Sequence, residues 1–175
     1  GSWVQIGTDI DGEAVYDQSG HSVSLSSDGS VVAIGAIYNN GNGTSSGSVR
    51  LYKNTSGTWV QIGGDINGEA AYDQSGSSVS LSSDGSVVAI GAPYNNANSG
   101  HVRLYKNTGD SWVQVSFDFD GEEAEGQSVW SVSLSSDGSV LAIGAITNNG
   151  SGGGRVDSGH VRLYKNRGGN WFQIG

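Results

Sequence analysis

The sequence has 175 residues with 30 glycines and one proline, and its lack of cysteine excludes disulfides, thiolate metal sites and cysteine catalysis. Its 14% charged and 9% aromatic residues indicate a folded, glycine-rich β protein, because disordered chains usually carry more charge and fewer aromatic rings. The formal net charge of -9 disfavours nucleic acid and anionic membrane surfaces as partners, since both are bound through Lys and Arg.

The chain consists of three copies of one repeat, which begin near residues 11, 67 and 120. Each copy contains a SVSLSSDGS segment, an AIGA segment and a VRLYKN segment, and each ends in a segment that opens with tryptophan. Trp3, Trp59, Trp112 and Trp171 are successively 56, 53 and 59 residues apart. A period of about 55 marks units that need neighbours to bury their apolar faces.

The pattern within each copy predicts four short strands. The first, at residues 22–26, 78–82 and 131–135, alternates serine with Val or Leu and leads through Asp-Gly into a tight hairpin. The second, at residues 30–36, 86–92 and 139–145, is apolar on both faces and is expected to be the most buried. The third, at residues 48–54, 101–107 and 160–166, and the fourth, from each later tryptophan, alternate again and are expected to be outer strands.

A repeated four-stranded meander predicts an all-β fold of β-propeller blades, with a β-solenoid as the main alternative. We expect one repeat domain over residues 1–175, with four-stranded antiparallel blades at 19–63, 75–115 and 128–175 and an extra strand within residues 1–8. Propellers typically close with four to eight blades, so three blades would leave open edges. The sequence therefore predicts a fragment of a larger propeller, or a homo-oligomeric ring or assembly of further copies.

The segments resemble the FG-GAP repeat of integrin-α-type propellers, whose blades read approximately FG-x-S-V, a hairpin, V-G-A-P and G-x-V-Y-V-Y. Residues 75–107, SGSSVSLSSDGSVVAIGAPYNNANSGHVRLYKN, carry the likeness most clearly. The opening FG is replaced by Ser-Gly or Ser-Val, and the proline survives only as Pro93. Integrin calcium loops lie in the first hairpin, which is only SSDGS here, so those ligands have no counterparts. The resemblance implies a non-enzymatic extracellular or cell-surface module for adhesion, matrix or surface-filament assembly through protein partners.

Twelve of the seventeen acidic residues fall in three stretches between the predicted blades. The pattern D-x-[DN]-G-E-x-x-x-D of the first two copies places oxygen ligands at alternating positions, which suits Ca²⁺. The alternative is that these groups cap turns and keep the surface soluble, so no cofactor is required. The candidate ligands are Asp9, Asp11, Glu13, Asp17, Asp65, Asn67, Glu69, Asp73, Asp118, Asp120 and Glu122.

Strand direction places the acidic stretches and the Asn-rich loops on one face of the predicted blades. The Asn-rich loops vary in length on a constant frame, as recognition loops do. Candidate ligand contacts are Trp130, which breaks the repeat, and Asn39, Asn40, Asn95, Asn96, Asn148 and Asn149. These residues support an alternative function, a lectin-like carbohydrate-binding propeller. Sequons at Asn42, Asn54 and Asn149 predict N-glycosylation in loops, which suits an extracellular setting.

The remaining repeated residues are expected to serve the fold. Arg50, Arg103 and Arg162 occur once per repeat and are expected to pair with a carboxylate or stack on a ring, and the repeated tryptophans to pack between blades. His101 and His160 are equivalent, and no nucleophile, phosphate-loop or zinc-helix motif is present, so we expect no enzyme. No run of eighteen apolar residues predicts a membrane span. Because SVSLSSDGS recurs unchanged, a consensus-built protein is a third possibility.

Overall fold

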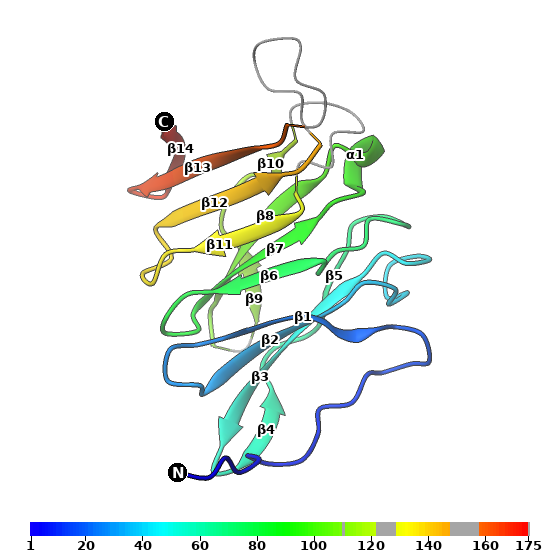
Figure 1. Cartoon of the computed structure of the whole chain (residues 1–175), viewed down its shortest axis with the longest axis vertical. Helices are drawn as coiled ribbons and strands as arrows, with labels where there is room; N and C mark the ends of the chain where they lie inside the picture. Colours follow the sequence, from blue (N-terminus) through cyan, green and yellow to red (C-terminus); the bar gives the residue numbers. More distant parts are fainter. Residues whose placement is uncertain (110, 122–128, 148–157, 175) are drawn as a thin grey trace.

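A computed structural model describes the chain except residues 110, 122–128, 148–157 and 175. Three antiparallel sheets, one for each repeat, follow one another along the long axis (Figure 1). The one described helix, α1 (Asn95–Asn98), is a single short turn in an Asn-rich loop. No helix among the described residues has the length and hydropathy that crossing a membrane requires.

Each sheet is a meander in which consecutive strands pair. The first sheet contains β1 (Ser19–Leu25), β2 (Val31–Ala36), β3 (Ser48–Thr55) and β4 (Thr58–Gln61). The second contains β6 (Ser78–Leu81), β7 (Val87–Ala92), β8 (His101–Asn107) and β9 (Trp112–Gln114). The third contains β11 (Ser131–Leu134), β12 (Val140–Ala145), β13 (His160–Arg167) and β14 (Asn170–Ile174). The four predicted strands of each repeat are therefore present.

Two further strands come from the acidic stretches, where the sequence predicted only loops. Ile66–Asn67 forms β5, which pairs with Val49 and Ser48 at the start of β3. Phe119–Asp120 forms β10, which pairs with Val102 and His101 at the start of β8. The linker that follows each of the first two repeats thus adds a short outer strand to the sheet of the repeat before it. We call residues 8–18, 62–77 and 115–130 the acidic linkers.

The unchanged SSDGS segment forms the same hydrogen-bonded turn in each repeat. Ser26 Oγ donates to Asp28 Oδ1 at 2.7 Å, the Ser30 amide donates to the same oxygen at 2.9 Å, and the Val31 amide donates to Ser26 Oγ at 2.9 Å. These bonds lower the pKa of Asp28 to about 2. The glycine that follows Asp28 has a φ of 69°, which an L side chain adopts poorly. The turn therefore requires each of these residue types.

The apolar core lies between the sheets. We call the face of a sheet toward the preceding repeat its leading face, and the opposite one its trailing face. Between the first and second sheets, the buried cluster contains Val31, Ala33, Val49, Leu51, Ile66, Val79, Leu81, Val88, Ile90 and Tyr105. Between the second and third sheets, it contains Ala89, Val102, Leu104, Phe119, Val129, Leu141, Ile143 and Trp171. All of β2 is buried, which confirms the prediction for the second strand of the repeat.

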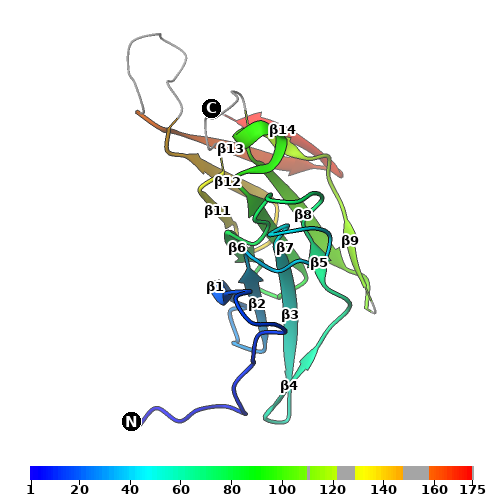
Figure 2. The ribbon, with the colours of Figure 1, turned by 90° about the vertical axis from the view of Figure 1, so that its right-hand side faces the viewer.

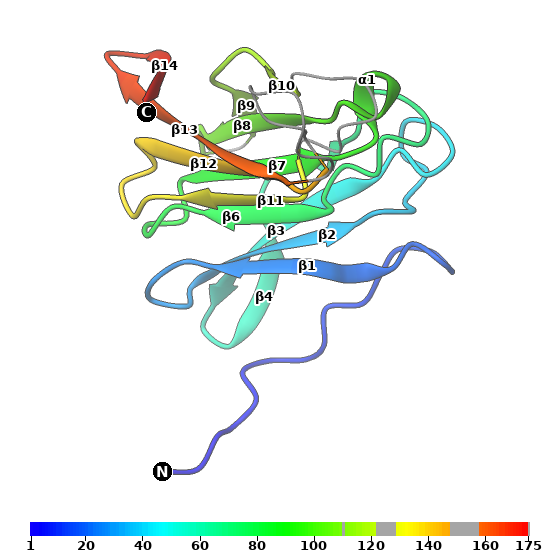
Figure 3. The ribbon, with the colours of Figure 1, turned by 45° about the horizontal axis from the view of Figure 1, so that its top comes forward.

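The inner strands β1, β6 and β11 succeed one another along one side of the stack (Figures 1 and 3). Serines of one inner strand accept hydrogen bonds from backbone amides of the next. Ser24 Oγ accepts from Leu81 N at 3.0 Å, and Ser80 Oγ accepts from Leu134 N at 2.9 Å. The serine face of the SVSLS pattern thus joins neighbouring blades at their inner edge.

The predicted extra strand at the N-terminus does not form. Residues 1–12 contain no strand, and the segment extends away from the sheets (Figure 2). Trp3 is 102% exposed, whereas its counterpart Trp112 is partly buried. A strand needs a partner for its backbone groups, and its counterparts β4 and β9 each pair with the third strand of their own repeat. Among the described residues, no strand pairs with residues 1–8.

Candidate functional site

One arginine per repeat holds the acidic linker that precedes its blade. The guanidinium Nη2 donates at 2.8 Å to a linker carbonyl in all three repeats, and the guanidinium lies over the tyrosine two residues further along the same strand. The carbonyl pairs are Arg50 with Asp11, Arg103 with Asn67 and Arg162 with Asp120. The corresponding distances to the tyrosine ring centroids are 5.6, 5.5 and 5.8 Å. The predicted structural role of the arginines is confirmed.

Because of these bonds, a linker joins the two blades that flank it. The backbone of β5 pairs with β3 in the first sheet, while its Asn67 carbonyl accepts from Arg103 in the second sheet. Glu69 adds an ion pair, with its Oε1 at 3.7 Å from Arg103 Nη1. The Arg103 side chain is buried, but the Glu69 side chain is 44% exposed, so this ion pair is only partly shielded from solvent. The acidic linkers are therefore part of the joints between blades.

The last aspartate of the linker pattern is buried and locks an Asn-rich loop. Asp17 is 2% exposed and its Oδ2 accepts from Asn39 Nδ2 at 2.8 Å. Asp73 is 4% exposed, and its Oδ2 accepts from Asn95 Nδ2 at 2.9 Å and from the Ala70 amide at 2.8 Å. The candidate ligand contacts Asn39 and Asn95 are thus occupied by carboxylates. Sequence reasoning missed this pairing, although the matching positions of Asp and Asn in two repeats are a signal for it.

Another linker position repeats a glutamine-aspartate bond. Asp9, Asp65 and Asp118 each accept, through Oδ1, from the glutamine four residues earlier, at 2.8, 2.7 and 2.7 Å. Together with the arginine and asparagine contacts, these bonds give a nitrogen partner to at least one side-chain oxygen of Asp9, Glu13, Asp17, Asp65, Glu69, Asp73 and Asp118. Calcium binding by the linkers stays a prediction.

Two of the repeated tryptophans donate an indole hydrogen bond to the segment that precedes their own repeat, and a third packs against such a segment. The predicted packing between blades is seen for Trp112 and Trp171. Trp59 Nε1 donates to the Ile6 carbonyl at 3.0 Å, and Trp112 Nε1 donates to the Ile62 carbonyl at 2.9 Å. In the third repeat Trp171 packs edge-on against Phe119, with ring centroids 5.7 Å apart. The outer strand of each repeat is thus tied to the segment at the end of the preceding one.

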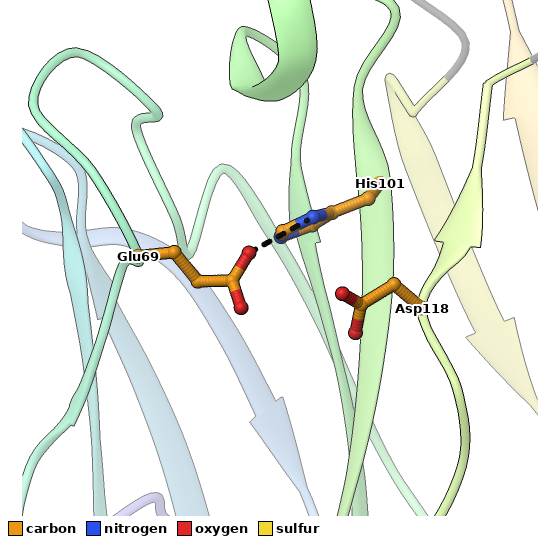
Figure 4. A group of neighbouring side chains, drawn as sticks. All are labelled: Glu69, His101 and Asp118. Carbon is orange, nitrogen blue, oxygen red and sulfur yellow. Dashed lines mark ion pairs between the residues drawn. The ribbon is translucent and has the colours of Figure 1, made fainter.

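Glu69, His101 and Asp118 form a cluster where the second blade meets the acidic linkers 62–77 and 115–130. One potential ligand atom from each lies within 4.8 Å of the others (Figure 4). His101 begins β8, is 1% exposed, and its Nδ1 lies 3.5 Å from Glu69 Oε2. Burial, followed by the nearby charge of Arg103, lowers the pKa of His101 below its ordinary value of 6.5. The imidazole is therefore neutral at pH 7 and retains a lone pair.

Two of the predicted glycosylation sites have amide nitrogens that the fold uses or encloses. Asn42 Nδ2 donates to the carbonyls of Gly68 and Glu69 at 3.0 and 2.8 Å, so a glycan there would displace both bonds. Asn54 lies in β3 rather than in the predicted loop, and its Nδ2 is buried.

The side chain of Asn96 and the candidates Glu122, Asn148 and Asn149 lie outside the described part of the structure. Asn40 Oδ1 accepts from the Ser45 amide at 2.8 Å.

Trp130 lines a pocket that lies across all three repeats. The pocket has a volume of about 290 Å³ and is lined by His21, Ile37, Tyr38, Gln74, Ser77, Pro93, Tyr94 and Trp130. His21, Ser77 and Trp130 occupy equivalent places in the repeats, as do Tyr38 and Tyr94. The sequence singled out Trp130 as a ligand contact, and the structure places it, 51% exposed, in the wall of this pocket.

The outer repeats expose faces that the inner junctions bury. On the leading face, Val23 and Leu25 are 64% and 59% exposed, whereas their counterparts Val79 and Leu81 are 8% and 7% exposed. On the trailing face, Val161 and Leu163 are 63% and 40% exposed, whereas Val49, Leu51, Val102 and Leu104 are fully buried. On the leading face, Val32, Ile34 and Tyr52 are buried, with Ile10 and Trp59 packed against them. The exposed parts of both faces therefore carry the residues of the internal blade junctions.

Residues 8–52 match the FG-GAP repeat family, which confirms the resemblance expected from the sequence. The fold and this match together define a β-propeller-type repeat protein whose first repeat is similar to the FG-GAP repeat. No curated protein sequence matches the chain.

Solved structures support the blade architecture. A protein from Bacteroides uniformis assigned as a 6-phosphogluconolactonase superimposes with a TM-score of 0.55 at 15% identity, covering 86% of this chain and 38% of that one. The periplasmic gluconolactonase of Pseudomonas aeruginosa gives a TM-score of 0.54 at 18% identity, covering 82% of this chain and 38% of that one. The chain thus spans 38% of the length of each. At these identities, the likeness shows the fold alone.

Proposed function

We propose that this chain is a non-enzymatic interaction module whose open blade faces bind further blades of the same type, supplied by a second copy of the chain. The observation that carries this proposal is the exposure of Val23 and Leu25 at positions where the next repeat buries Val79 and Leu81. Inside the chain, the residues equivalent to each open face are covered by a neighbouring blade of the same repeat. A blade of this repeat is therefore the partner that fits each open face. An FG-GAP module of this kind suits adhesion, matrix or surface-filament assembly outside the cell.

The two open faces are different surfaces, so copies would associate head to tail. The leading face of one copy would meet the trailing face, with Val161 and Leu163, of the next. Heterologous contacts of this type close into a ring when the rotation between copies permits, and otherwise extend into a filament. Each contact would bury apolar side chains at roughly 25 cal/mol per Å² of apolar area removed from water.

A complementation experiment with two variants tests this proposal. Leu25→Asp places a charge on the leading face, and Leu163→Asp places one on the trailing face. Each variant alone should be reduced to the mass of a single chain by light scattering, because every head-to-tail contact needs one leading and one trailing face and one of the two is blocked in every copy. Val113→Asp is the matched control, since Val113 is 47% exposed within the second sheet, whose two faces are covered.

Mixing the variants distinguishes head-to-tail docking from other association. A Leu25→Asp copy retains its trailing face and a Leu163→Asp copy retains its leading face, so the mixture should form a one-to-one complex through those two surfaces. Assembly of either variant to the same mass as the Val113→Asp control would overturn the proposal. A mixture that contains no heterodimer would overturn it as well.

The pocket at Trp130 supports a second candidate function, the binding of a carbohydrate. Tyr38, Tyr94 and Trp130 offer aromatic surfaces, and Gln74 and His21 offer polar groups, which is the combination that sugar rings use. Trp130→Ala should abolish any glycan-array signal, whereas Trp3→Ala, which removes a tryptophan outside the pocket, should preserve it. A signal that survives Trp130→Ala would remove the pocket from consideration.

A further inference from the structure

The cluster of Glu69, His101 and Asp118 unites three separate chain segments. Glu69 follows β5 in the linker between the first two blades, His101 begins β8, and Asp118 precedes β10 in the next linker. Figure 4 shows the His101 ring and the Asp118 carboxylate directed toward the Glu69 side chain. The three ligand atoms lie within 4.8 Å of one another. In a tetrahedral zinc site with bonds of about 2.1 Å, ligand atoms lie roughly 3.4 Å apart, so modest side-chain movements would close the set on an ion.

A second observation points to a missing partner at this place. His101 is 1% exposed, and its Nε2 is buried without a hydrogen-bond partner among the described residues. Its Nδ1 lies 3.5 Å from the Glu69 carboxylate, beyond the usual length of a strong charge-assisted hydrogen bond. Buried polar groups are nearly always satisfied, and no hydrogen bond reaches either ring nitrogen of His101 among the described residues. An ion on Nδ1, the nitrogen that faces Glu69, would give the buried imidazole a partner on that side, while Nε2 would keep its proton.

The donor set selects the kind of ligand. It combines one imidazole nitrogen with carboxylate oxygens, a mixture that suits zinc and similar divalent transition metals. Calcium prefers six to eight oxygens and has little use for an imidazole. Two carboxylates and one neutral imidazole carry two negative charges, and Arg103 offsets one of them from 3.7 Å away. Arg103 also holds the linker that carries Glu69, through the bond from its Nη2 to the Asn67 carbonyl.

We propose that Glu69, His101 and Asp118 bind one divalent transition-metal ion of the zinc type at the joint between the second blade and its two linkers. The ion would connect Glu69 of the second acidic linker directly to Asp118 of the third and thereby stiffen the angle between blades. This proposal is independent of the docking of open faces, because none of the three residues belongs to those faces.

The repeats supply matched variants for the test. In the first repeat Ser48 occupies the place of His101, so His101→Ser introduces a residue that this strand already accommodates. Likewise, Ser77 occupies the place of His21 in the second repeat, so His21→Ser is a control that removes an exposed histidine in the same way. His160→Ser tests the equivalent position of the third repeat. Near-UV circular dichroism of each variant establishes that its tryptophan packing is retained.

The measurement is a titration of the untagged, EDTA-treated chain with Zn²⁺ by calorimetry and with Co²⁺ by visible absorption. We expect saturable binding that weakens at least about tenfold in His101→Ser and in Glu69→Gln and is unchanged in His21→Ser. Excess Ca²⁺ should not displace the bound ion. The absence of saturable binding, equal binding by a folded His101→Ser variant, or displacement by Ca²⁺ would each overturn the proposal.

Discussion

Leu25 and Leu81 provide a direct test of how much a blade junction contributes to stability. They occupy the same position of the repeat, yet Leu81 is 7% exposed in the first junction and Leu25 is 59% exposed on the open leading face. We expect Leu81→Ala to destabilise the chain far more than Leu25→Ala. The two substitutions remove the same atoms from the same type of strand, so the difference between them isolates the neighbouring blade.

The size of the difference follows from burial. Fully burying a leucine side chain is worth about 1.5–3 kcal/mol, and the cavity left by alanine adds to the loss. Leu81 belongs to the apolar cluster with Val31 and Leu51, so Leu81→Ala should cost about 3 kcal/mol of unfolding free energy. Leu25→Ala should cost less than about 1 kcal/mol in a single copy, because its side chain already contacts water.

The assay is thermal unfolding followed by tryptophan fluorescence, at a concentration where light scattering shows single copies. In a chain of this size 1 kcal/mol corresponds to about 2–4 °C, so Leu81→Ala should lower the Tm by about 6–12 °C and Leu25→Ala by less than about 4 °C. Equal shifts for the two variants, or a larger shift for Leu25→Ala, would refute the assignment of Leu81 to a buried junction.

Three further outcomes are expected from contacts at the turns and joints. Arg103→Ala should lower the unfolding free energy by about 2 kcal/mol in urea denaturation. Arg103→Lys should not restore it, because one ammonium cannot reproduce the Nη2 bond to the Asn67 carbonyl together with the Nη1 contact with Glu69. Asp28 and Asp137 have pKa values of about 2, below the ordinary 3.8, so their stabilising effect is complete above about pH 4 and is lost as the pH falls toward 2. Replacing both with Asn should make the fall in Tm between pH 4 and 2 shallower, and an unchanged slope would contradict this account. Trp112→Phe removes one indole hydrogen bond and should cost about 1 kcal/mol by the same denaturation assay, whereas a neutral effect would show that the bond joins the blades only weakly.

The strands were predictable because local pattern and burial agree in this repeat. Val79 and Leu81 alternate with serines because one face of β6 lies in the apolar cluster between blades. The run of β7 is apolar on both faces because the strand is buried. The Asp-Gly turn was predictable for the same local reason, since its bonds join residues two to five positions apart. Resemblance to the FG-GAP repeat then favoured propeller blades over a solenoid.

The joints between blades were not predictable in the same way, because they depend on contacts between distant segments. The pairing of Ile66 with Val49, and the bond from Arg103 to a linker carbonyl, involve backbone groups that leave no mark in the residue pattern. The acidic pattern suggested a calcium loop, yet Asp17 and Asp73 are buried against asparagines that were themselves expected to contact a ligand. Burial of a carboxylate is visible only once the loops are placed.

The predicted N-terminal strand shows the limit of local pattern most clearly. The WVQI sequence from Trp3 matches that of β4, but a strand forms only where a partner strand offers free backbone groups. The same reasoning applies to the open leading and trailing faces. Their residues are those of an internal blade junction, yet no blade of the same copy covers them, so these faces say most about how the chain associates.

The solution mass of the unmodified chain, measured by light scattering over a range of concentrations, tests the central claim most directly. With a chain mass of 17.9 kDa, docking of open faces predicts a mass that rises with concentration from that of the single chain to at least twice that value. The same series in Ca²⁺ and in EDTA shows whether the acidic linkers need metal for this association. A mass of 17.9 kDa at every concentration in both buffers would contradict the proposal that further copies cover the open faces.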